Sequence, residues 1–464
     1  MQGVDEAEYA LRTAEALGAE YAEAYFERSY ANSFAIEQGR VNASAHGEEA
    51  GIRIRLIMKG RLYTASTNKL DKGCIKRLIH RFRIFPGLTT RLSREKRERA
   101  SYKVHEKQSV DDANMLKDLM KIDKELGKAK HIRYRSLYGG LGRSRTYYVN
   151  SDGTRISSDV PSTSAFFAIT VSNGRESRQS MTQLGNTGGY EYFDASEVSS
   201  DLVDSSKRLH SVLERGKTLS NTALKSIKNI VISPEISGIA SHESVGHPNE
   251  ADRVFGREAA QAGTSYMTRE NMGLEIGSKA VTIIDDPTIR NSNGYYLYDE
   301  EGVRARPREI VEKGVQKEML TNREFAHLLG LRSNGSARSD SYSNEPLIRM
   351  SNTYLKPGSA TLDELISEAG NGIYLKRFSS TEWNIDDTRS FARYAGNEAY
   401  IIRKGSLEEP VKNYKLDSAT LDFWHAVALI GNDFELYVAT CGKGEPMQGV
   451  PVTNGGASAL LRFK

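Results

Sequence analysis

The chain is organised around Ile239-Ala240-Ser241-His242-Glu243-Ser244-Val245-Gly246-His247-Pro248-Asn249-Glu250. This stretch places two imidazoles around a carboxylate in a segment that is otherwise typical of a short buried helix, just after the β-rich run Asn229-Ile230-Val231-Ile232. A zinc protease needs two neutral imidazoles on the ion and a carboxylate beside the open position. His242, His247 and Glu243 are residues of the right types, so the sequence indicates metal chemistry first.

The two histidines are spaced one residue further apart than in the familiar His-Glu-x-x-His motif. On a regular α-helix, residues five apart point about 140° away from each other, whereas residues four apart differ by only about 40°. A π-type turn would return both imidazoles to one face. Gly246 lets the backbone distort and Pro248 ends the helix. We therefore predict a strained or π-bulged turn over residues 244–247. The alternative is a pair of surface histidines, or a hydrogen-bonded cluster without a metal.

Cys441 is the candidate third ligand, because it follows a strand-like run and opens a Gly-rich turn in Tyr437-Val438-Ala439-Thr440-Cys441-Gly442-Lys443-Gly444. The chain has only two cysteines, Cys74 and Cys441. Such scarcity is typical of a reducing compartment and not of a disulfide framework. Two alternatives stay open: Cys441 can be a small buried apolar residue, or it can pair with Cys74.

Several further stretches carry a resemblance to a known family. The chain resembles the TldD/PmbA family of zinc metallopeptidases, and within it the TldD-type member with the His-Glu-x-x-x-His motif. The matching stretches occur in family order and cover the C-terminal half: Thr282-Ile283-Ile284-Asp285-Asp286, Tyr298-Asp299-Glu300-Glu301-Gly302, Ile310-Val311-Glu312-Lys313-Gly314, Ser333-Asn334-Gly335-Ser336-Ala337-Arg338, Arg349-Met350-Ser351-Asn352-Thr353-Tyr354-Leu355-Lys356-Pro357-Gly358, Gly396-Asn397-Glu398-Ala399-Tyr400, and Cys441-Gly442-Lys443 with Gly449-Val450-Pro451-Val452. Pro248 departs from the pattern, in which glycine is expected.

The resemblance implies that His242, His247 and Cys441 bind zinc and that Glu243 is the catalytic carboxylate. Glu243 would act as general base on zinc-bound water in peptide hydrolysis. The resemblance also implies that the substrates are peptides or unfolded polypeptide segments, bound as an added strand. It further implies a dimer, either with a second copy or with a PmbA-type relative that lacks the metal motif. Glu250 and Asp252 are candidates for orienting the histidines, although carboxylates after a helix more often face solvent.

Length and composition place the chain among ordinary globular proteins of more than one domain. It has 464 residues, of which 38% are hydrophobic and 27% charged. Chains of this length usually exceed what one hydrophobic core supports. No run approaches the roughly 20 apolar residues of a membrane span, and the first residues lack the features of a signal peptide. We therefore expect a cytoplasmic protein without a membrane partner.

The order of helical and strand-like patterns predicts an α+β fold. We expect an N-terminal α/β subdomain (1–75), a basic helix and linker (76–108), a central α/β subdomain (109–215) and a C-terminal metallopeptidase domain (228–464). In the first 215 residues, helices over residues 5–17, 110–126 and 196–214 would pack on antiparallel sheets. The last region, mainly β, would form a curled sheet or incomplete barrel that carries the metal-binding helix.

The strongly basic run over residues 76–99 supports one rival function, a DNA-associated regulator. However, it contains little aromatic interleaving and no recognised nucleic-acid motif, and a net charge of +4 is small for this length. Nucleic acid is therefore not expected as a partner, and the run is more typical of a solvated helix and linker. A second rival is a non-catalytic partner subunit, against which the intact residues His242, Glu243, His247 and Cys441 argue.

Overall fold

Two very long antiparallel hairpins build the N-terminal sheet of the computed structural model, which describes residues 3–82, 89–108, 112–258 and 264–464. Strand β1 pairs with β2, β5 pairs with β6, and β1 joins the two hairpins through β5. The sheet order is β3-β2-β1-β5-β6-β4, with β7 also on β6. The strands of this sheet are β1 (Tyr21–Glu37), β2 (Arg40–Met58), β3 (Arg61–Thr67), β4 (Arg99–Lys103), β5 (Ile132–Asn150), β6 (Arg155–Ser172) and β7 (Ser177–Thr187).

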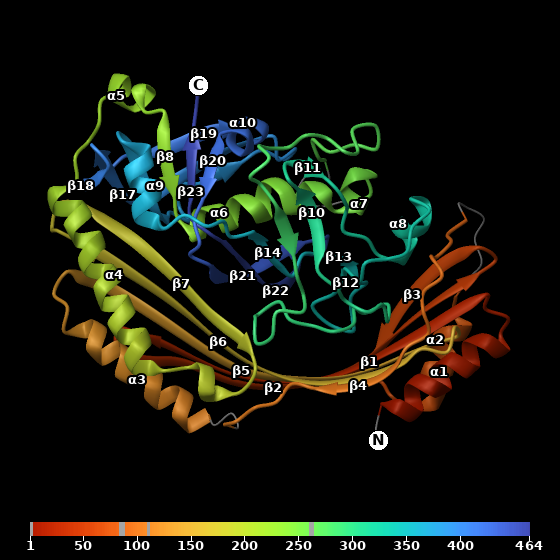
Figure 1. Ribbon diagram of the computed structural model, residues 1–464. Helices are drawn as coiled ribbons and strands as arrows, with labels where there is room; N and C mark the ends of the chain where they lie inside the picture. Colours follow the sequence, from red (N-terminus) through yellow and green to blue (C-terminus); the bar gives the residue numbers. More distant parts are fainter. Residues whose placement is uncertain (1–2, 83–88, 109–111, 259–263) are drawn as a thin grey trace.

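Helices cover the convex face of this curved sheet at its two ends, whereas the C-terminal region lies over the concave face (Figure 1). One end is covered by α1 (Val4–Ala16) and α2 (Lys72–His80), and the other by α3 (Asp112–Gly127) and α4 (Ala195–Arg215), with the short η1 (Tyr190–Tyr192) before α4. Each end has its own apolar core. The core under α1 and α2 includes Ala7, Leu11 and Ile54, and the core under α3 and α4 includes Leu119 and Phe167. The helices predicted over 5–17 and 196–214 are therefore confirmed, as is the part of the helix over 110–126 that the structure describes. In the basic run 76–108, helix extends only to His80 in the described residues.

The strands are longer than the sequence predicts, because glycines and exposed residues interrupt the alternation of apolar and polar residues that indicates a strand. Residues 132–150 show two strand-like runs separated by Gly139 and Gly140, yet they form the single strand β5. A Cβ at Gly139 would lie 2.6 Å from the Sδ of Met115 on α3. The glycine thus gives room for a helix to pack closely on the strand. Strand β4 is a further addition: it lies in the predicted linker and pairs in parallel with β6.

The C-terminal region consists of two larger sheets, a two-stranded ribbon and short helices. The six-stranded sheet contains β9 (Ile283–Asp285), β10 (Arg308–Glu312), β11 (Val315–Gln316), β14 (Asn352–Leu355), β21 (Glu435–Lys443) and β22 (Gln448–Gly456). The eight-stranded sheet contains β8 (Asn229–Ile232), β15 (Gly372–Phe378), β16 (Asn384–Ile385), β17 (Phe391–Arg403), β18 (Ser406–Val411), β19 (Lys415–Ala419), β20 (Val427–Ile430) and β23 (Ala459–Arg462). Strands β12 (Ala337–Arg338) and β13 (Leu347–Ile348) form the ribbon.

The largest apolar core of the molecule lies in this C-terminal region and includes residues of α6 and of both large sheets. The helices here are α5 (Asn221–Ser226), α6 (Pro234–Ser241), η2 (His242–Gly246), η3 (His247–Asn249), α7 (Ala251–Val254), α8 (Arg323–Leu328), α9 (Leu362–Ala369) and α10 (Thr420–His425). The α+β fold class is thus confirmed. No helix in the described part of the chain is both long and apolar enough to cross a membrane.

Buried ion pairs join the N-terminal sheet to the C-terminal region. Arg55 Nη1 lies 2.8 Å from Glu23 Oε1 and 2.9 Å from Glu301 Oε1. Its neighbour on the same strand, Arg53, lies 2.8 Å from Glu300 through Nη2 and Oε2. Buried charges lose much of their solvation, and leaving one without its partner is strongly destabilising. These pairs therefore restrict how the two layers can fit together.

Glu27 lies in the same interface and responds to pH. Its Oε2 accepts a hydrogen bond from the backbone N–H of Tyr342 at 2.9 Å. Burial and the nearby carboxylate of Glu300 raise the pKa of Glu27 to about 7. A glutamate in the unfolded chain has a pKa of about 4.3. Between these two values the folded chain keeps a proton that the unfolded chain has lost, so folding stability falls as the pH rises from about 4.3 to about 7.

We predict that Glu27→Gln removes this pH dependence. The amide keeps an acceptor for Tyr342 but carries no charge, so the variant should be more stable than the parent at pH 8 by up to about 4 kcal/mol and similar to it at pH 4.5. Guanidinium unfolding at the two pH values measures the difference. Glu15→Gln, which changes an exposed carboxylate on α1, is the matched control. An equal effect of Glu27→Gln at both pH values would contradict the assignment.

Candidate metal centre

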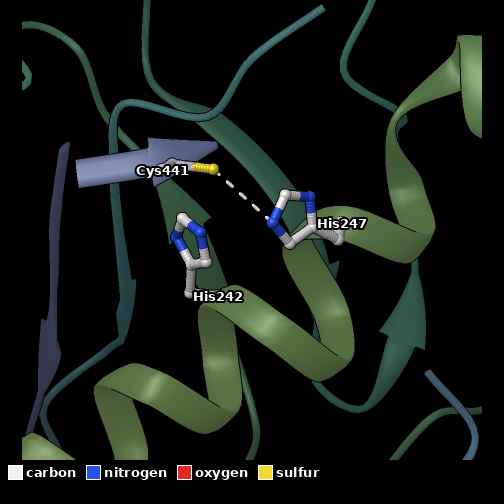
Figure 2. Close-up of side chains that lie close together, drawn as sticks. All are labelled: His242, His247 and Cys441. Carbon is white, nitrogen blue, oxygen red and sulfur yellow. Dashed lines mark hydrogen bonds between the residues drawn. The ribbon is translucent and has the colours of Figure 1, made fainter. Parts of the chain in front are cut away.

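A widened turn follows α6 and carries the two histidines of the motif. Helix α6 (Pro234–Ser241) continues into η2, a π-helix over His242–Gly246, and then into η3, a 3-10 helix over His247–Asn249. The backbone N–H of His247 donates to the carbonyl of His242, five residues earlier. The predicted π-type turn is therefore confirmed, beginning slightly earlier than expected. As Figure 2 shows, both imidazoles point to the same side.

A glycine is required at position 246 for a different reason from the backbone flexibility that the sequence suggests. Its backbone is ordinary helix, with φ −60° and ψ −62°, so no special conformational freedom is used. A Cβ built on Gly246 would instead lie 2.0 Å from the Sδ of Met350. The glycine is needed because the turn packs directly against this methionine side chain.

Cys441 reaches the two histidines from the neighbouring sheet, on strand β21. Its Sγ lies 3.5 Å from Nε2 of His247, and the ring centroids of His242 and His247 are 4.9 Å apart. One donor atom from each of the three residues lies within 4.8 Å of the others, and all three residues are buried (Figure 2). Cys441 and Cys74 are both free thiols, so the alternative of a disulfide between them is wrong.

A buried carboxylate orients His247 from behind. Oε2 of Glu250 lies 2.9 Å from Nδ1 of His247, which leaves Nε2 directed at the thiol. Lys443 Nζ lies 3.1 Å from the same oxygen and 2.7 Å from Oδ1 of Asp252. Of the two carboxylates predicted to orient the histidines, Glu250 is the one that contacts a histidine. Asp252 instead pairs with Lys443 and contributes only indirectly.

The pKa values of Cys441 and His247 shift toward an ion pair. Burial alone would raise the pKa of the Cys441 thiol, but the facing imidazoles of His247 and His242 hold it well below its usual value. Burial would lower the pKa of His247, but Cys441 and Glu250 raise it to about 9. Both shifts favour a thiolate and an imidazolium when no metal is bound. A metal ion would displace the His247 proton, so its affinity should weaken as the pH falls.

Glu243 and an arginine far away in the sequence share the cavity at these ligands. Nη1 of Arg389 lies 2.7 Å from Oε2 of Glu243. Both residues line a cavity of about 570 Å³, together with His242, His247 and Cys441. Neither Arg389 nor Lys443 is among the site residues that the sequence predicts. Lys443 could have been noticed, because it lies two positions after Cys441 and therefore on the same face of the strand, whereas no local signal identifies Arg389.

The donor set of this cluster fits zinc. Imidazole nitrogens and a thiolate are the ligands that zinc takes in proteins, and three of them leave a fourth position open. Nδ1 of His242 is buried and has no hydrogen-bond partner among the residues that the structure describes. Buried polar atoms are rarely left unsatisfied, and a nitrogen of this kind beside a thiolate is suited to a metal ion.

Models of one protein family match three successive regions of the chain. A model of the PmbA/TldA metallopeptidase C-terminal domain matches residues 226–458, and models of domain 1 and of the central domain match residues 22–81 and 105–225. The chain belongs to the PmbA/TldD metallopeptidase family.

Relatives of known name cover nearly the whole chain. A metalloprotease of Methanothermobacter thermautotrophicus is 30% identical over 96% of this chain and 94% of its own length. A zinc metalloprotease TldD homolog of Saccharolobus solfataricus is 28% identical over 96% of each chain. The crystal structure of TldE from Thermococcus kodakarensis has a TM-score of 0.73, with 16% identity, 98% of this chain and 99% of that chain covered. This last likeness concerns the fold alone.

We predict that Glu250→Gln weakens zinc binding by about 10- to 100-fold, because the amide cannot hold His247 as the carboxylate does. Competition with a coloured chelator measures the affinity. Glu275→Gln, which changes a carboxylate whose side chain is 72% exposed, should leave it unchanged. An affinity of Glu250→Gln within threefold of the parent would show that Glu250 does not act through His247.

We also predict that Gly246→Ala destabilises the chain by about 1–3 kcal/mol and lowers zinc affinity, because the new methyl group meets Met350. Thermal unfolding and chelator competition measure the two effects. Met350→Ala in the same chain removes the clash and should restore part of the zinc affinity. No restoration in the double variant would mean that the clash with Met350 is not the cause.

Proposed function

We propose that this chain is a zinc-dependent metallopeptidase that hydrolyses peptides or unfolded polypeptide segments. His242, His247 and Cys441 would hold the metal, and Glu243 would act as the general base. The observation that carries the proposal is the meeting of these donors within 4.8 Å in a cavity that Glu243 also lines. The names of the relatives support a metalloprotease but do not identify its base or its substrate.

Zinc in this position would supply a Lewis acid that polarises the scissile carbonyl and makes water more acidic. The protein must supply the proton transfer and the position of the substrate. Glu243 has one oxygen fixed by Arg389 at 2.7 Å, and its side chain is 19% exposed. A carboxylate that is held in place and still reaches the cavity can take a proton from water and return it to the leaving amine.

The edge of strand β21 is the place where we propose that the peptide binds. In the described structure β21 ends its sheet and pairs only with β22. Cavities of about 570, 640 and 750 Å³ border this strand. An extended peptide could add to the open edge through backbone hydrogen bonds. Because only a single unfolded strand fits such an edge, peptides and unfolded segments are the substrate class that we propose.

We further propose that the chain works in the cytoplasm as a dimer, with a second copy or with a PmbA-type relative. Strand β2 supports pairing through the N-terminal sheet. Its residues 40–49 are exposed, and β3 covers only the strand from Ile52 to Met58. Long open edges of this kind are normally covered in proteins.

We predict that Glu243→Ala keeps zinc but lowers peptide hydrolysis by roughly 100-fold or more, because a general base contributes about 10²- to 10⁴-fold. His242→Ala and Cys441→Ala should lose zinc and activity together. Zinc content of the purified variants, with cleavage of an unstructured reporter peptide before and after chelation, measures both properties.

The control is His327→Ala, which removes an exposed histidine of α8 and should change neither property. Full activity of Glu243→Ala would contradict the role of this carboxylate. A parent protein that binds zinc but cleaves no unfolded peptide would instead be a non-catalytic subunit. Salt-dependent binding of DNA without proteolysis would favour the regulator.

A further inference from the structure

A second cavity, of about 640 Å³, lies between the concave face of the N-terminal sheet and the C-terminal region. Tyrosines from both layers and the serine and threonine hydroxyls of β5 and β6 are prominent in its lining. Four charged residues also reach it: Arg143, Arg338, Asp299 and Glu300. Any of these four side chains that lacks an oppositely charged partner determines which ligand charge the cavity favours.

Arg338 differs from the other charged residues of the cavity, because its acceptors are all uncharged. Its Nη1 donates to the carbonyl of Met350 at 2.8 Å, and its Nη2 donates to the carbonyl of Pro451 at 2.9 Å. Within the described ranges no carboxylate lies within 4.0 Å of its guanidinium. By contrast, Arg143 lies 2.6 Å from Asp159 and 2.9 Å from Glu106.

The two carboxylates that line the cavity are already engaged elsewhere. Glu300 pairs with Arg53 at 2.8 Å and accepts two hydrogen bonds from Ser339, at 2.7 and 2.6 Å. Asp299 is 5% exposed and accepts three backbone N–H bonds, from Glu301, Val303 and Ala337, at 2.9–3.1 Å. Neither carboxylate forms an ion pair with Arg338 in the described structure, although the charge of Glu300 acts on it from a greater distance.

The surroundings keep the guanidinium of Arg338 in place. It lies over the ring of Tyr296, 5.2 Å from the centroid. A second cation, the fully buried Arg349, donates among the described residues to the backbone carbonyls of Gln448 and Cys441. Burial and the neighbouring Arg349 lower the pKa of Arg338. The opposite effects of Tyr296, Glu300 and Asp285 on this pKa do not offset them. A fixed cation that no carboxylate contacts favours an anionic ligand.

The position of Arg338 relates this cation to the metal centre. The carbonyl that accepts its hydrogen bond belongs to Pro451, which pairs with Thr440 across β21 and β22. Thr440 lines both this cavity and the metal cavity, and it precedes the ligand Cys441. A strand rises about 3.3 Å per residue. Of these two cavities, Val438 lines only the one at Arg338 and Cys441 only the one at the metal, so the two cavities lie on opposite faces of β21. Successive side chains of an extended peptide alternate between faces in the same way, so a side chain on the face of Arg338 can be adjacent to the residue held at the metal.

We propose that Arg338 is a specificity-determining residue that binds a carboxylate of the substrate, next to the bond that is cut. The carboxylate belongs either to an acidic side chain or to the C-terminus of the peptide. This inference rests on the proposed function, since it names the substrate class of the same site. Arg338 binds the substrate and takes no part in proton transfer.

The test uses the metal-free parent protein, in which binding can be measured without cleavage. The probes are four fluorescein-labelled octapeptides of alanine and serine, with one central Glu or Gln and with a free or an amidated C-terminus. Fluorescence anisotropy gives their dissociation constants. We expect the carboxylate-bearing probe to bind about 10- to 100-fold more tightly than its amide, as a charge-assisted hydrogen bond would give. The pair that shows the difference identifies the source of the carboxylate.

Variants then assign the preference to one residue. Arg338→Gln should remove the difference between acid and amide, and Arg338→Lys should keep part of it because the charge remains. With zinc restored, Arg338→Gln should raise KM for the preferred peptide about 10-fold or more, with little change in kcat. Arg393→Gln is the matched control, since Arg393 pairs at 2.7 Å with Asp417 outside this cavity, and it should keep the preference.

Equal binding of acid and amide probes by the parent protein overturns the inference, whatever the variants do. A preference that survives in a folded Arg338→Gln variant overturns it as well. These outcomes are separate from the proposed function. Glu243-dependent cleavage without a carboxylate preference would refute only the inference, whereas a carboxylate preference in a zinc-loaded protein that cleaves nothing would refute only the peptidase.

Discussion

One turn of helix, widened by a single residue, determines where this chain can hold a metal ion. On a regular helix His242 and His247 would point in different directions, and no strand could meet both. The π-type bond between their backbones turns them to one side, and the packing of Gly246 on Met350 leaves no room for another side chain at the turn. Cys441 completes the cluster only because β21 lies against the end of this turn. The site is thus a property of the junction between a helix and a sheet.

Behind the donors lies a set of buried charged side chains that contact the ligand residues and one another. Lys443 contacts Glu250, Glu250 contacts His247, and Arg349 donates to the carbonyl of Cys441. Such groups lose much of their solvation on burial, and removing one leaves its partner exposed to that cost. The arrangement holds the ligands in fixed orientations before any ion arrives, which reduces the reorganisation that binding requires.

The sequence predicts those features that depend on neighbours along the chain. The π-type turn follows from the spacing of the histidines and from Pro248, and the helices follow from their apolar period. The sequence predicts shorter strands, because residues 40–49 of β2 are all exposed and show no alternation of apolar and polar positions. Arg389 and Arg338 could not be assigned roles, since each meets its partners only after distant segments fold together. A single sequence records no such meeting.

The open edge of β21 limits which substrate proteins can bind, because they must supply a free strand. A protein whose strands are all engaged in its own sheets has none to offer, whereas a chain that has lost its structure offers many. On the proposed function, the rate at which a substrate protein is degraded would follow the population of its locally unfolded forms. The stability of a substrate protein's native fold would then determine whether it survives exposure to this enzyme. No separate recognition tag would be needed.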